Sequence, residues 1–218
     1  MTEQVTEQLE NQYAGIVNHV LWDDLAALDP KEVADRSGAT LSFDPKGAPA
    51  HSLPFLGAVY EVRQGDRSIL PPEGTPQPGY QAAIVMLSYL VNAANGPAPG
   101  LSGVEVAPRE IPSGDLFFKG PHELMKAPVA EAYADRPLAL LEAASSIGAV
   151  PTGRLSFSLH ALPYVGLYCY MDPGDSEFPP QIRYNFDSNI HYYLQLDGIF
   201  AMVNCLGTLL VALAKGAC

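Results

Sequence analysis

Basic side chains are scarce in this sequence. The 218 residues include 12 lysines and arginines against 24 aspartates and glutamates, which gives a formal net charge of −12. Binding to a nucleic-acid backbone requires clustered lysine and arginine, so the charge balance excludes nucleic acid as a partner. An anionic membrane surface attracts the same basic clusters and is excluded for the same reason. We therefore expect the partner to be a small-molecule cofactor or another protein.

Cysteine is scarce as well. The three cysteines, Cys169, Cys205 and Cys218, are odd in number and widely spaced, and no Cys-x-x-Cys pair occurs. This pattern excludes a disulfide framework and lacks the ligand pairs that are typical of zinc sites and iron–sulfur clusters. Reduced thiols are typical of the cytoplasm, which is where we expect this protein.

The sequence pattern leads us to expect neither a signal peptide nor a membrane span. Its start, Met1 to Gln8, is polar and acidic, whereas a signal peptide needs a basic start followed by an apolar run. The longest apolar stretch, 199–214, falls just short of the usual membrane-spanning length and contains Asn204, Gly207 and Thr208. We interpret this stretch as a buried helix of the core.

Familiar catalytic motifs are missing too. The sequence contains neither a GxGxxG fingerprint nor a Walker A loop, and it lacks HExxH and GxSxG. These absences remove the main support for a nucleotide-dependent enzyme or a serine hydrolase. A function has to be sought in less specific groups of residues.

The apolar periodicity predicts an α+β fold. Steps of three and four over residues 3–28 indicate an amphipathic N-terminal helix, and a second, short helix begins after Asp29 and ends at Gly38. Short strands follow near 39–62. Further helices are expected at 80–94, from Pro121 and at 138–147, and the last third predicts strands at 154–162, 165–171 and 181–186 and a helix at 194–214.

We therefore expect N-terminal helices, antiparallel sheet structure with strands near 39–62 and 155–187, middle helices and a long C-terminal core helix. The pattern does not decide whether the two groups of strands form one sheet. The last three strands are interpreted as an antiparallel meander that packs on that helix. The chain 1–218 is expected to form a single compact domain, and the proline-rich stretch 70–79 is where it could divide.

Acidic residues gather in and after the turn between the second and third strands of this meander. Asp172, Asp175 and Glu177 are spaced i, i+3, i+5, and Asp187 follows further on. Carboxylate oxygens at such a spacing could bind a hard cation such as calcium or magnesium. The alternative is a solvated turn in which Asp172 caps backbone amides, because the calcium-loop signature is incomplete. We keep Asp175, Glu177 and Asp187 as the candidate metal ligands.

Histidine and tyrosine are the candidate residues for a cofactor. The histidines are too widely spaced to form a local ligand pair, and the most interesting is His122, at a predicted helix start that favours the neutral ring. Tyrosines on the predicted strands could line a pocket for a flat ligand, although core packing is the alternative. The candidate cofactor-binding residues are His122, Tyr168, Tyr170, Tyr184 and His191.

Several segments together resemble one known family. These segments are Asp29 to Ala34, Leu53 to Gly57, Arg109 to Pro112, Phe117 to His122, Gly174 to Pro179 and Asn185 to Asp187. Through them the chain is similar to the family catalogued as domain of unknown function 3786, found mainly in anaerobic bacteria and archaea. The resemblance implies an anaerobic cytoplasm and proximity to corrinoid or other metal-cofactor metabolism. Some relatives carry an extra cysteine-rich iron–sulfur segment, whose cysteines this chain lacks, so no iron–sulfur cluster is expected in it.

Three functions remain open on the sequence alone. The first, which we favour, is an accessory protein that binds a cofactor or ligand, for instance a tetrapyrrole, a corrinoid or a divalent metal. The second is a structural or regulatory subunit of a larger complex. The third is a metal-assisted enzyme in which His122 acts together with Asp175, Glu177 or Asp187.

Overall fold

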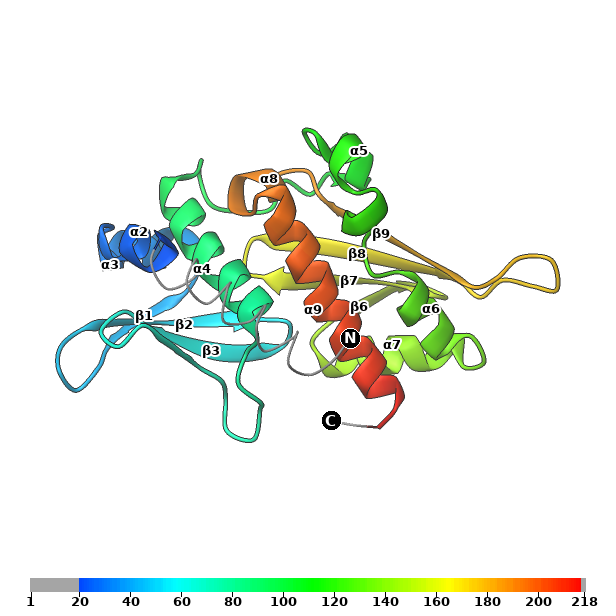
Figure 1. Cartoon of the computed structure of the whole chain (residues 1–218), viewed down its shortest axis with the longest axis horizontal. Helices are drawn as coiled ribbons and strands as arrows, with labels where there is room; N and C mark the ends of the chain where they lie inside the picture. The colour runs from blue at the N-terminus through cyan, green and yellow to red at the C-terminus, as the bar shows by residue number, and fades with distance from the viewer. Residues whose placement is uncertain (1–19, 217–218) are drawn as a thin grey trace.

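The structure is a computed structural model that describes residues 20–216. Two antiparallel sheets lie side by side, and the long helix α9 (Leu196–Ala214) crosses in front of the second sheet (Figure 1). Most of the N-terminal helix expected at 3–28 lies outside the described residues; the described part of that range contains the short helix α2 (Trp22–Ala26). The α+β fold class predicted from the sequence is confirmed.

The first half begins with α3 (Pro30–Ser37), whose ends follow the sequence signals. Asp29 Oδ1 accepts hydrogen bonds of 2.9 Å from the backbone N–H groups of Lys31 and Glu32, and Gly38 ends the helix at a φ of +71°. A sheet with its four strands in chain order follows: β1 (Thr40–Phe43), β2 (Pro49–Phe55), β3 (Ala58–Arg63) and β4 (Ser68–Leu70). Strands near 39–62 are therefore confirmed, and β4 was not predicted.

The turn between β2 and β3 joins the two halves of the protein. Leu56 and Gly57 both adopt positive φ, 47° and 83°, as the central residues of a tight hairpin turn require. The N–H of Leu56 donates a 3.0 Å hydrogen bond to the carbonyl of Ala161 in the second sheet. A Cβ on Gly57 would lie 2.5 Å from the carbonyl oxygen of Ile147. Only glycine fits this close approach.

Helix α4 (Tyr80–Asn95) follows the proline-rich stretch, and the second sheet is then built from distant parts of the chain. Its strand order is β5-β9-β8-β7-β6, with every neighbouring pair antiparallel. The strands are β5 (Glu105–Val106), β6 (Val150–Gly153), β7 (Ser156–Leu162), β8 (Val165–Asp172) and β9 (Gln181–Asp187). Strands β7 to β9 form the predicted meander.

Short helical segments lie between β5 and β6. They are η2 (Pro108–Glu110), α5 (Gly114–Phe117), η3 (Gly120–His122), α6 (Ala127–Tyr133) and α7 (Pro137–Ser146). The helix expected from Pro121 is corrected to the single 3-10 turn η3, because Gly120 has a φ of +57° and Glu123 is already extended. Helix α6, a few residues later, has no counterpart in the sequence prediction.

Helices α8 (Ile190–Tyr193) and α9 end the described chain. Helix α9 is long and apolar enough to cross a membrane by length and composition. In this structure it packs against α4, α6 and α7 and buries side chains such as Ile199, Leu206 and Leu210 in the core. This packing agrees with the interpretation of residues 199–214 as a core helix.

The second sheet has one inner and one outer face. On β7 the residues Phe157, Leu159 and Ala161 are buried, as the alternation predicted, while His160 is exposed. Helices α6 and α7 contact β9 and β7. Side chains of β8 and β9 that point away from the core remain half-buried or exposed; they are Tyr168, Tyr170, Arg183 and Asn185. This outer face carries one wall of the candidate site.

Candidate functional site

A pocket of about 480 Å³ lies where η2 and α5 meet the outer face of β9. Its volume falls within the range of about 300 to 1,000 Å³ that is typical of small-molecule sites. The charged side chains in its lining are Arg109, Lys119, Arg183 and Asp115, and Asn185 and Phe118 lie beside them. We call this the basic pocket.

Close backbone packing builds the helical wall of the basic pocket. A Cβ on Gly114, at the start of α5, would lie 2.0 Å from the carbonyl oxygen of Pro108 in η2. Glycine therefore allows α5 to rest directly on η2. The carboxylate of Glu110 accepts a 2.6 Å hydrogen bond from the N–H of Ala107, which stabilises η2 from within. These contacts set Arg109 and Asp115 on neighbouring turns.

Strand β9 supplies the opposite wall through Arg183 and Asn185. The guanidinium carbon of Arg183 lies 4.6 Å from the ring centre of its cross-strand partner Tyr170. The Tyr170 hydroxyl donates to Glu105, with both carboxylate oxygens 2.8 Å away, and Asn185 Nδ2 donates to Glu105 Oε1 at 2.6 Å. This network holds Arg183 and Asn185 in fixed positions.

Tyr170 acts in this network as a hydrogen-bond donor. Burial, followed by the hydrogen bond to the Glu105 carboxylate, raises the pKa of Tyr170 to about 12. The hydroxyl therefore stays protonated at neutral pH. Glu105 is correspondingly occupied, since both of its oxygens accept hydrogen bonds from the sheet.

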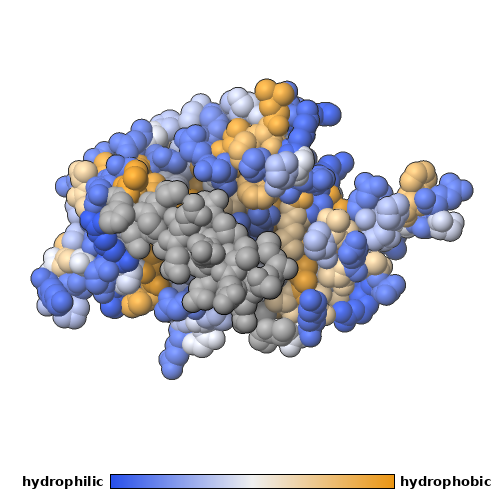
Figure 2. Space-filling view, in the orientation of Figure 1, coloured by the Kyte–Doolittle hydropathy of each residue, from blue (hydrophilic) through white to orange (hydrophobic). Residues whose placement is uncertain are grey.

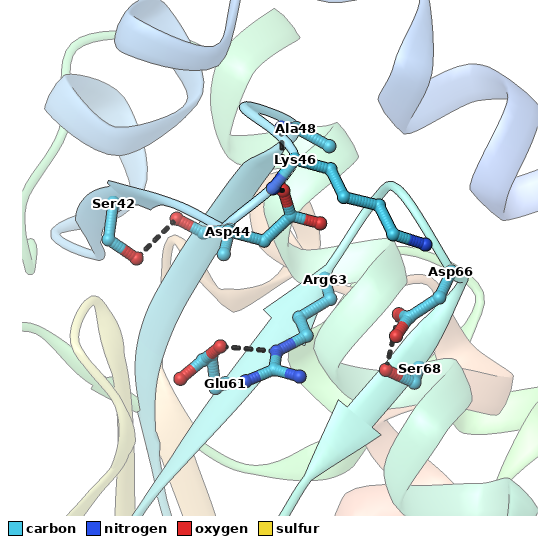
Figure 3. Close-up of polar contacts among 9 residues, drawn as sticks. Ser42, Asp44, Lys46, Ala48, Glu61, Arg63, Asp66 and Ser68 are labelled. Carbon is cyan, nitrogen blue, oxygen red and sulfur yellow. Dashed lines mark hydrogen bonds and ion pairs between the residues drawn. The ribbon is translucent and has the colours of Figure 1, made fainter.

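The three cations of the basic pocket have no carboxylate partner among the described residues. Within residues 20–216, no ion pair involves Arg109, Lys119 or Arg183. By contrast, Arg63 pairs with Glu61 on the outer face of the first sheet, where charges of both signs alternate (Figure 3). Positive charge is therefore concentrated locally in a protein whose net charge is −12.

The three predicted metal ligands are not brought together. Asp175 and Glu177 lie in the loop that projects between β8 and β9 (Figure 1), whereas Asp187 lies at the far end of β9 from this loop. The length of β9 alone, at about 3.3 Å per residue, separates the two places by about 20 Å. Within residues 20–216, no three His, Cys, Asp or Glu side chains are grouped to hold a metal. The single cation site predicted from the sequence is thus corrected.

The Asp175 side chain stabilises the turn in which it lies. This agrees with the alternative interpretation of the acidic segment as a solvated turn with capped backbone amides. Its Oδ1 accepts hydrogen bonds from the N–H groups of Glu177, at 2.8 Å, and Phe178, at 2.9 Å. These backbone hydrogen bonds lower the pKa of Asp175. Asp172 caps the N–H of Gly174 in the same way, at 3.0 Å.

Asp187 is fully buried and holds the loop before β5. It accepts hydrogen bonds from the N–H and hydroxyl of Ser102, from the N–H of Gly103 and from the N–H of Asn189. Burial acts to raise the pKa of Asp187, but these hydrogen bonds outweigh it and lower the pKa overall. Both of its oxygens are thus committed to the fold.

The candidate cofactor residues also lie in separate places. Tyr184 is buried and its cross-strand partner is Cys169, so it faces the core, away from Tyr168 and Tyr170. His122 is exposed and stacks on Phe117 with ring centres 4.4 Å apart. His191, in α8, has its Nδ1 2.9 Å from the Ser188 carbonyl oxygen. These five residues do not line one cavity, and Tyr170 adjoins the basic pocket through Arg183.

The sequence interpretation missed the basic residues that do converge. Arg109 and Lys119 lie within two segments of the family-like pattern, and Arg183 is the one lysine or arginine between Leu155 and Ala214. Isolated basic residues within acidic surroundings were the available signal. Their convergence depends on the pairing of β5 with β9, which local patterns do not reveal.

Comparison with known protein families shows that this site lies within a family domain. A family described as Domain of unknown function (DUF3786) matches residues 29–208. The chain belongs to this family. The DUF3786 match includes η2, α5 and β9, so both walls of the basic pocket lie within the family domain. No curated protein and no solved structure matches this DUF3786 chain.

Proposed function

We propose that this protein is a ligand-binding accessory protein of the cytoplasm that holds a small anionic molecule in the basic pocket. The observation that carries the proposal is the convergence of Arg109, Lys119 and Arg183, without carboxylate partners in residues 20–216, on one pocket of about 480 Å³. The proposal keeps the expected role of ligand binding in anaerobic metabolism. It defines the ligand by its negative charge rather than as a metal or an axially ligated tetrapyrrole.

The geometry around Arg183 favours recognition of a carboxylate or phosphate group. A guanidinium presents a planar set of donors that matches the two oxygens of such groups. Stacking on Tyr170 restrains the Arg183 side chain before any ligand arrives. Less conformational entropy is then lost on binding, which increases affinity.

We expect replacement of Arg183 to abolish most anion binding. The wild type and an Arg183→Gln variant are titrated calorimetrically with ethyl phosphate and with propionate. A charge-assisted hydrogen bond contributes roughly 1.5–3 kcal/mol, so the variant should bind about ten-fold more weakly or worse.

Arg154→Gln is the matched control for this experiment. Arg154 is also exposed and unpaired with a carboxylate in residues 20–216, but it lies at the β6–β7 turn, outside the basic pocket. Its replacement should leave the affinity unchanged. Equal losses in both variants, or absence of binding by the wild type, would contradict the proposed function.

A second candidate function, a subunit role in a larger complex, is favoured by an apolar patch on α5. Leu116 is 74% exposed, and Phe117, stacked on His122, lies beside it. Figure 2 shows hydrophobic surface gathered over this helix at the top of the molecule. Exposed apolar patches of this kind mark interaction surfaces.

This second candidate predicts that Leu116→Asp releases the protein from a complex. In size-exclusion chromatography of native extract with light scattering, the wild type should elute in a larger particle and the variant as a monomer. Val59→Asp is the control, because Val59 is 55% exposed on the first sheet, away from α5. A wild type that is monomeric in every fraction counts against the subunit role.

A further inference from the structure

We infer that the ligand of the basic pocket carries an amine beside its anionic group, as an amino carboxylate or an amino phosphate ester does. The inference rests on the proposed function and deepens it. Its starting point is Asp115, an exposed carboxylate in the lining of the same pocket. Within residues 20–216, Asp115 forms no hydrogen bond through its side chain and no ion pair.

Asp115 and Lys119 are four residues apart in the sequence, yet they form no ion pair. Residues four apart pair readily on a helix, as Lys31 and Asp35 do in α3. Asp115 and Lys119 have the same spacing, but α5 ends at Phe117, so Lys119 leaves the helix before it can face Asp115. The two charges therefore stay apart in the pocket lining, and each remains available to a ligand.

The other carboxylates near the pocket are already occupied. Glu105 accepts hydrogen bonds from Tyr170 and Asn185, and Glu110 accepts one from the N–H of Ala107. Asp115 is thus the carboxylate that can bind a cationic group of the ligand. A simple anion drawn in by the three cations is repelled by Asp115, whereas an added ammonium turns that repulsion into attraction.

Because positive charge is in excess in the pocket, the ligand needs its anionic group first and its amine second. The lining carries three cations and one carboxylate, so an amine without an anionic group is repelled overall. An anion without an amine is bound, but less well than one that satisfies both signs. The arrangement selects a small bipolar molecule over both simple classes.

The test compares matched probes that differ by the amine. The full-length protein is titrated calorimetrically with ethyl phosphate against O-phosphoethanolamine, and with propionate against β-alanine. An exposed ion pair contributes about 0.2–1 kcal/mol, so the wild type should bind the amine-bearing member of at least one pair about 1.4- to five-fold more tightly. The phosphate pair and the carboxylate pair distinguish the two kinds of anionic group.

The Asp115→Asn variant then assigns this preference to one side chain. It should bind the amine-bearing member of the preferred pair no more tightly than the plain anion, with ethyl phosphate or propionate bound at least as tightly as by the wild type. Asp135→Asn, at an exposed aspartate outside the basic pocket, should keep the preference.

Failure of the inference and failure of the proposed function have different signatures. Equal binding of both members by the wild type, or a preference that survives Asp115→Asn, overturns the bipolar ligand while leaving Arg183-dependent anion binding in place. If none of the four probes binds the wild type, the proposed function and the inference fall together. Circular dichroism on each variant checks that the fold is unchanged.

Discussion

Replacing Asp187 with alanine is expected to lower the free energy of unfolding by about 2–4 kcal/mol, because a buried carboxylate with several hydrogen bonds is lost. Asp187 is 0% exposed and its Oδ1 lies 3.0 Å from the N of Ser102 and 3.1 Å from the N of Asn189. Its Oδ2 lies 2.8 Å from the N of Gly103. Alanine leaves these donors without their acceptor and releases the loop before β5.

Urea denaturation of three proteins separates burial from hydrogen bonding. Asp175→Ala is the matched control, since Asp175 also accepts hydrogen bonds from two backbone N–H groups but is exposed. Water can replace an exposed acceptor, so this variant should lose less than about 1 kcal/mol. Similar losses for Asp187→Ala and Asp175→Ala would show that Asp187 has no special structural role.

The contribution of Asp187 also has a defined pH dependence. Because its pKa is lowered in the folded protein, the unfolded state binds the proton more readily as the solution is acidified. The stabilisation is therefore fully present above the ordinary aspartate pKa of about 3.9 and is lost as the pH falls through the folded pKa. The difference between wild type and Asp187→Ala should shrink on acidification below about pH 4.

Local patterns in the sequence predicted the elements whose signals lie within a few residues. The Asp29 cap, the stop at Gly38 and the alternation along β7 need no information from distant parts of the chain. The short strands β4 and β5, with three and two residues, carry too little periodicity to be recognised. They are strands because of their partners: β4 pairs with the adjacent strand β3, and β5 pairs with the distant strand β9.

The candidate site could not be predicted in the same way because it depends on register and on long-range contact. Successive residues of a strand face opposite sides, so the partner of Tyr184 decides whether it joins Tyr168 and Tyr170 or the core. That partner is Cys169, and the long β8–β9 loop hides this register from the sequence. Arg109 and Arg183 line the same pocket because β5, which precedes η2, pairs with β9 at the edge of the sheet.

Replacing Gly57 with alanine is expected to lower the free energy of unfolding by about 3 kcal/mol or more. Two costs combine: a left-handed backbone conformation costs a non-glycine residue about 1–2 kcal/mol, and overpacking costs typically 1–3 kcal/mol. The new Cβ would lie 2.5 Å from the carbonyl oxygen and 2.7 Å from the Cα of Ile147. Both are backbone atoms, so relief requires the β2–β3 turn to move away from the second sheet.

Gly47→Ala is the matched control, because it carries the conformational cost without the overpacking cost. Gly47 has a φ of +82°, almost the same as the +83° of Gly57, but no atom lies within 4 Å of the added Cβ. It should lose only the conformational part, about 1–2 kcal/mol. The excess loss of stability in Gly57→Ala, measured by urea denaturation, then reports the contact of the turn with Ile147.

Since Leu56 in the same turn donates its N–H to Ala161, displacement of the turn should also weaken this hydrogen bond between the sheets. Faster exchange of the Leu56 amide in Gly57→Ala than in Gly47→Ala is the expected result, and equal stability and exchange in the two variants would show that the sheets are held together elsewhere.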